Sequence, residues 1–131
     1  MVDNPGPGYR AHPEHNIELV PYEGLVVVEA SGQPLASSNR AWVMRETGYP
    51  AVYYIPREDV KMQNLAPRGE QSYCPFKGYA SYFGLPNGKE ALAWSYEAPY
   101  DEIASVVRHL SFYPKRVDKY HVLPNSHVRL P

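Results

Sequence analysis

Prolines are spread along almost the whole chain, with 14 among its 131 residues. Proline fixes φ and lacks an amide donor, so closely spaced prolines prevent long helices. The chain also has 12 tyrosines, and tyrosine is enriched in strands. These two features predict a mainly β protein of the α+β type, with short strands joined by stiff turns.

The length and composition fit one soluble domain with its own core. The hydrophobic share is 44% and the charged share 21%, both ordinary for a globular domain. A formal net charge of -1 gives no field that would attract nucleic acid or an acidic membrane. We therefore expect neither partner, and the oligomeric state stays open.

Cysteine use and the first residues bear on the compartment. Cys74 is the only cysteine, which excludes an internal disulfide and agrees with a reducing environment. The opening residues, MVDNPGPGYRAHPEH, contain no apolar core of a signal peptide, and no apolar run reaches membrane-spanning length. We expect a cytoplasmic protein.

Three segments are predicted along the chain. Residues 1–16 carry three prolines and two glycines, which is typical of an extended N-terminal arm. Residues 17–122 form a single β-rich domain, and residues 123–131 form a loosely held C-terminal tail. Within the domain, residues 25–30 and a return strand after Ser31-Gly32 predict a hairpin.

Alternating residue patterns predict further strands. For the first of these, residues 40–46, a helix is the alternative. The long polar stretch 57–71 is expected to be a connection. The Asn87-Gly88 pair is a hairpin signal. Apolar residues spaced i, i+3, i+4 and i+7 predict one helix over residues 100–110. The further strands are expected at residues 40–46, 51–55, 77–83 and 90–98, with extended structure at 112–122.

Five motifs, in order, resemble a known family: GYRAHPEH, YPAVYYIPREDVKM, SYCPFKGYASY, AWSYEAP and FYPKRVD. The chain resembles the bacterial and fungal family 427 of the domains of unknown function over roughly residues 7–122. The resemblance implies a compact β-tent-like fold, with two small antiparallel sheets and one packed helix. Relatives of that fold often hold zinc through two cysteine pairs, which a chain with Cys74 alone cannot do.

The family also carries a label that suggests nucleotidyltransferase activity. That chemistry needs a metal held by clustered carboxylates and a cradle for phosphate groups. The sequence offers neither a closely spaced pair of aspartates on a strand nor a glycine-rich loop that opens a helix. His12 and His15 lack an evident third ligand, so we expect no metal and no cofactor.

The candidate catalytic residues are Glu46, Tyr54 and Lys77. Charged side chains on strands usually face solvent, and a surface salt bridge is the ordinary interpretation of Glu46 and Lys77. The alternative places them in a cleft between the sheets. There a carboxylate and an ammonium group beside a tyrosine could do acid–base work or hold an anion.

The candidate ligand-binding residues are Arg40, Tyr82 and Trp94. The planar guanidinium of Arg40 suits a carboxylate or phosphate group, but it also suits an acidic partner within the protein. The two aromatic residues could line a pocket or belong to the core. Cys74 would be activated by Lys77 only if the backbone turns at Pro75; otherwise it is an inert structural residue.

These residues predict a small-molecule-binding domain. Its enzymatic form would be an acid–base enzyme that acts on a small polar or aromatic metabolite in the cleft. Glu46 or Tyr54 would move a proton, while Lys77 and Arg40 hold a developing negative charge. The alternative is a non-catalytic binding or protein-interaction module that uses the same tyrosine-rich surface, and a metal-dependent nucleotidyltransferase is the third hypothesis.

Overall fold

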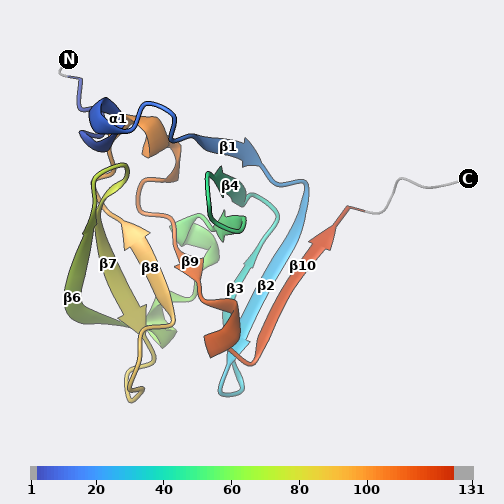
Figure 1. Cartoon of the computed structure of the whole chain (residues 1–131). Coiled ribbons are helices and arrows are strands. Elements are labelled where there is room, and N and C mark those ends of the chain that lie inside the picture. Colours follow the sequence, from blue (N-terminus) through green and yellow to red (C-terminus); the bar gives the residue numbers. More distant parts are fainter. Residues whose placement is uncertain (1–2, 126–131) are drawn as a thin grey trace, which may run out of the picture.

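The computed structural model describes residues 3–125, and its architecture is mainly β, as predicted (Figure 1). The described residues form three antiparallel sheets, with strand orders β1-β4-β5, β10-β2-β3 and β6-β7-β8-β9. The strands are β1 (Ile17–Pro21), β2 (Gly24–Ala30), β3 (Gln33–Ser38), β4 (Trp42–Glu46), β5 (Val52–Tyr54), β6 (Ala66–Cys74), β7 (Gly78–Gly84), β8 (Ala93–Tyr96), β9 (Ser111–Phe112) and β10 (Lys119–Pro124). The expected number of two sheets is wrong, because β2 and β3 pair with the C-terminal β10 as a separate sheet.

The helices are all short. They are α1 (Gly8–Ala11) and the 3₁₀ helices η1 (Arg57–Asp59), η2 (Met62–Asn64), η3 (Asp101–Val106) and η4 (Pro114–Arg116). No helix in residues 3–125 has the length and apolar character needed to span a membrane. Figure 1 shows β6, β7 and β8 on one side and β2, β3 and β10 on the other, with β9 between them.

The predicted first hairpin is present as β2 and β3. Its two turn residues, Ser31 and Gly32, have φ values of 52 and 74°, and positive φ at both positions gives a turn whose twist matches that of the strands. Along β2, Val26, Val28 and Ala30 are buried and alternate with less buried residues. The burial along β2 therefore has the period of a strand with one face towards the core.

The polar stretch 57–71 is not a simple connection. It contains η1 and η2 and then enters β6, which runs from Ala66 to Cys74 along β7. The pairing of β6 with β7 shifts register between Pro67 and Gln71, around Gly69, whose φ is 88°. Most of β6 is exposed, so its sequence lacks the alternation that identifies a half-buried strand.

The predicted α-helix over residues 100–110 is wrong. The chain forms the 3₁₀ helix η3, which is interrupted at Ile103, and then turns through Arg108 with a φ of 63°. Leu110 forms two backbone hydrogen bonds with Ile55, of 2.7 and 2.9 Å. This bridge needs extended backbone where the helix would have continued, and it leaves Val107 44% exposed.

Both ends of the described chain contact the body of the domain. The N-terminal arm includes α1 and lies on the body of the domain, since the Gly8 amide donates to the Pro75 carbonyl at 2.9 Å. At the other end, β10 continues through Pro124. The rest of the predicted tail, residues 126–131, lies outside the described residues.

Candidate functional site

A cavity of about 290 Å³ lies between the β1-β4-β5 sheet and the β6-β7-β8-β9 sheet. Its walls are mostly aromatic and aliphatic, with one carboxylate and one ammonium group. The lining residues are Met44, Glu46, Tyr49, Pro50, Val52, Tyr54, Lys77, Ala80, Tyr82, Trp94, Tyr96 and Tyr113. The fold thus brings together five of the six predicted site residues: Glu46, Tyr54, Lys77, Tyr82 and Trp94.

The period of the strands explains why these side chains meet. Ala80 and Tyr82 are two apart on β7, and they pair directly with Tyr96 and Trp94 on β8. Residues two apart on a strand point to the same face, so this pair of strands supplies one wall. Strands β4 and β5 supply the opposite wall in the same way.

Glu46 and Lys77 form an ion pair at the edge of the cavity. The Lys77 Nζ lies 2.5 Å from Glu46 Oε1, and the two side chains are only 15 and 7% exposed. A tight turn after β6 places the lysine there, because the Lys77 amide donates to the Cys74 carbonyl at 3.2 Å. The chain therefore does turn at Pro75, but the ammonium group pairs with Glu46.

His15 was not predicted as a site residue. Its Nε2 lies 2.8 Å from Glu46 Oε2, and its side chain is 14% exposed. The ring stacks on Phe76, with centroids 4.0 Å apart and planes 22° apart. Only the fold-back of the arm creates these contacts, so spacing could not reveal them. In residues 3–125, no three His, Cys, Asp or Glu side chains form a metal-binding group.

Tyr54 and Trp94 form a polar contact in the wall of the cavity. The Trp94 Nε1–H group donates to the Tyr54 hydroxyl oxygen at 3.0 Å, and Tyr54 is 1% exposed. Burial raises the pKa of Tyr54 well above its usual value, and it raises the pKa of Tyr96 in the same way. Both side chains therefore stay neutral phenols and remain hydrogen-bond donors at neutral pH.

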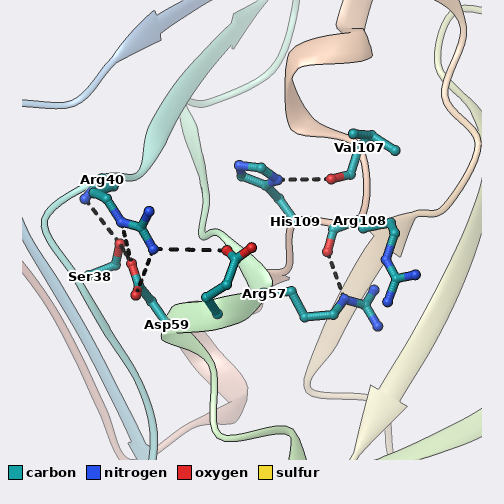
Figure 2. A network of polar contacts seen from close by, with 8 residues as sticks. Ser38, Arg40, Arg57, Asp59, Val107, Arg108 and His109 are labelled. Atoms are coloured by element: carbon teal, nitrogen blue, oxygen red, sulfur yellow. Dashed lines mark hydrogen bonds and ion pairs between the residues drawn. The ribbon is translucent and has the colours of Figure 1, made fainter.

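Arg40 does not line this cavity, in contrast to the prediction. Figure 2 shows its guanidinium group turned towards Asp59, with Nε 3.2 Å from Oδ2 and Nη2 3.0 Å from Oδ1. The Ser38 hydroxyl donates to the same carboxylate at 2.6 Å. The sequence left two alternatives for Arg40, a ligand group or an acidic partner within the protein. In the structure Arg40 has the acidic partner, Asp59.

This carboxylate gives a pH-dependent prediction for Asp59→Asn. Burial alone would raise the pKa of Asp59, but the hydrogen bonds from Arg40 and Ser38 hold it below its ordinary value. A lowered folded-state pKa stabilises the fold above the unfolded pKa of about 3.9, and the effect is lost as the pH falls through the folded value. We expect Asp59→Asn to cost about 1 kcal/mol at pH 7 in urea unfolding.

The loss should shrink towards zero as the pH falls through the lowered folded-state pKa of Asp59, because wild-type Asp59 is then protonated as well. Glu58→Gln is the control, because Glu58 is 78% exposed and lies 3.9 Å from Arg40; it should change stability little. An equal loss for Asp59→Asn at pH 7 and below this pKa would contradict the assignment.

The fold and this cavity define a small β domain with a partly open candidate site that has aromatic and aliphatic walls. Residues 18–123 match the model of the family described as Domain of unknown function (DUF427), and the chain belongs to this family. The first of the motifs that suggested the family, GYRAHPEH, precedes the matched segment. Among curated proteins, none matches this chain.

Proposed function

We propose that this domain binds a small molecule in the cavity between the two sheets. The observation that carries the proposal is the Glu46–Lys77 ion pair, which is buried at the edge of an aromatic cavity. Charged groups are rarely buried unless they are paired, and apolar pockets with a few placed polar groups are typical ligand sites. A volume of about 290 Å³ suits a ligand of about one ring.

The polar groups on the cavity wall favour a ligand with an acceptor oxygen. The Lys77 ammonium has three N–H donors, of which Glu46 Oε1 accepts one. The Tyr54 oxygen accepts from Trp94, while its own hydrogen can be donated. A carbonyl or carboxylate oxygen that lies between Lys77 and Tyr54 would accept from both, with the aromatic residues around the rest of the ligand.

The same arrangement supports acid–base chemistry as the enzymatic form of the proposal. Lys77 would stabilise negative charge that develops on the ligand oxygen, and Tyr54, kept protonated by burial, would donate a hydrogen bond to it. Glu46 is the one carboxylate among the lining residues, so it is the group that would take up a proton. The proposal includes a cytoplasmic location and no resident cofactor.

NMR of the two tryptophan indoles tests the binding proposal. Trp94 lines the cavity and Trp42 does not. We expect millimolar benzamide, acetophenone or benzoate to shift the Trp94 indole N–H signal, and to leave that of Trp42 in place. Ethylbenzene, which lacks an acceptor oxygen, should act more weakly.

Leucine substitutions at two alanines, one in the cavity and one outside it, test whether the probes bind in the cavity. Ala80 is 3% exposed and lines the cavity. A leucine at this position would fill part of the cavity, so Ala80→Leu should weaken the binding of every probe at least several-fold. Ala104 is exposed on η3, and Ala104→Leu should have no effect. If no probe moves the Trp94 signal, or if Ala80→Leu binds as well as the wild type, the proposal fails.

An exposed tyrosine pair makes an interaction module the second candidate. Tyr73 and Tyr79 are 46 and 59% exposed, and their ring centroids lie 4.8 Å apart. Tyr79 precedes Ala80 on β7, so it faces away from the cavity. Tyr79→Ser should therefore leave probe binding unchanged, and it would impair only a function that uses this outer face.

A further inference from the structure

We infer that the N-terminal arm, residues 3–16, completes the candidate site, and that His15 is a positioning residue for Glu46 and, through it, for Lys77. This inference rests on the proposed function for the role of the site, although its own test needs no ligand. The arm lies before the segment that the family model matches, which begins at residue 18. The matched domain alone would therefore lack one of the three residues in this polar cluster.

The arm is held on the domain by specific contacts along its length. Near its start, the Asn4 amide donates to Asp101 Oδ2 at 2.6 Å, and the Gly6 amide donates to Glu102 Oε1 at 2.9 Å. At its end, the Asn16 amide donates to the Thr47 hydroxyl at 3.0 Å. The positions before, within and after α1 are thus fixed.

The turn that carries Lys77 accepts the arm only at very short range. A Cβ atom on Gly8 would lie 2.9 Å from the Phe76 ring, and a Cβ atom on Gly6 would lie 2.9 Å from the Phe76 carbonyl oxygen. A side chain at position 6 would force the arm away from the turn, and one at position 8 would displace either the arm or the Phe76 ring. The close approach brings the His15 ring onto the Phe76 ring, which also has the Tyr9 ring at 4.9 Å and the His12 ring at 6.2 Å.

Hydrogen-bond chemistry then determines what His15 does. An ionised carboxylate only accepts hydrogen bonds, so the 2.8 Å contact with Glu46 Oε2 requires a hydrogen on His15 Nε2. Glu46 then receives one donor on each oxygen, His15 on Oε2 and Lys77 on Oε1. One donor on each oxygen restricts the rotation of the carboxylate, and this restricts the place of the ammonium group at the cavity edge.

The test measures Lys77 directly, by acetylation with limiting acetic anhydride and mass spectrometry. The remaining lysines serve as internal references. We expect Lys77 to be acetylated several-fold faster in His15→Ala than in the wild type. Without the hydrogen bond from His15, the Glu46 carboxylate can rotate and releases the Lys77 ammonium group more readily. His15→Gln, whose amide can donate, should restore much of the protection.

His12→Ala is the matched control, because His12 lies on the same arm with a 62% exposed side chain. It should leave Lys77 labelling unchanged. A folded His15→Ala variant with wild-type labelling of Lys77 would overturn the inference. So would a His12→Ala variant that accelerates labelling equally, because this would mean that the arm acts only as a structural cover.

A measurement on the wild type remains decisive even if the variants do not fold. Long-range ¹H–¹⁵N correlation spectra of the histidine rings should show a hydrogen on His15 Nε2, and a neutral ring with its hydrogen on Nδ1 alone would refute the contact. Because labelling and ring spectra involve no ligand, they can succeed when the probe compounds fail to bind. The proposed function and the role of His15 can therefore fail separately.

Discussion

Lys77→Met should lower the free energy of unfolding by about 3 to 5 kcal/mol at pH 7, the usual cost of removing one partner of a buried ion pair. The remaining Glu46 side chain is only 7% exposed, so water replaces the lost ammonium group only in part. Urea unfolding followed by tryptophan fluorescence gives this value. The loss reflects a buried carboxylate left without its cation, with only the His15 contact remaining, more than the net strength of the pair.

A double variant and a surface pair provide the controls. Glu46→Gln combined with Lys77→Met should recover most of the stability, because a neutral amide no longer needs a cation. Lys119 pairs with Glu29 at 3.6 Å, with side chains 46 and 38% exposed, so Lys119→Met should cost less than about 1 kcal/mol. Equal losses for the two lysine variants would mean that the Glu46–Lys77 pair behaves as a surface pair.

Adjacent valines give the second large effect. Val106→Ala should cost about 2 kcal/mol, because it removes methyl groups from a fully buried side chain and leaves a cavity. Val106 is 0% exposed, whereas Val107 is 44% exposed. Val107→Ala should therefore change the free energy of unfolding by less than about 0.5 kcal/mol.

The comparison distinguishes the 3₁₀ turn from the predicted α-helix. In a helix with its apolar stripe inward, positions 106 and 107 would both face the core, and both substitutions would be costly. Thermal and urea unfolding of the two variants measure the difference. Similar losses at both positions would contradict the turn and support the helix.

Period-two patterns explain why much of the cavity could be predicted. Glu46, Tyr82 and Trp94 lie on strands whose alternation is visible in the sequence, and alternation decides which side chains share a face. Lys77 and Tyr54 lie on a turn and a strand that border the same space. The sequence could not show how large the cavity is, because its size depends on how closely the two sheets pack.

The positions of Arg40 and His15 could not be predicted, because they depend on contacts with residues far away in the sequence. Arg40 pairs with Asp59, 19 residues away, and His15 pairs with Glu46, 31 residues away. Both pairings follow from how loops and the arm fold back. The apolar spacing of Ile103, Val106 and Leu110 did indicate three fully buried residues, but a 3₁₀ turn followed by extended chain buried them instead of an α-helix.

The irregular pairing of β6 bears on how copies of this protein meet one another. An edge strand offers free backbone donors and acceptors, and a flat edge can recruit a strand from another molecule. Strand β6 is at the end of its sheet, and its register shift lies beside Gly69. This bulge bends the edge, so a second copy could not add a regular strand along its whole length, and the long polar strand is protected from aggregation through sheet extension.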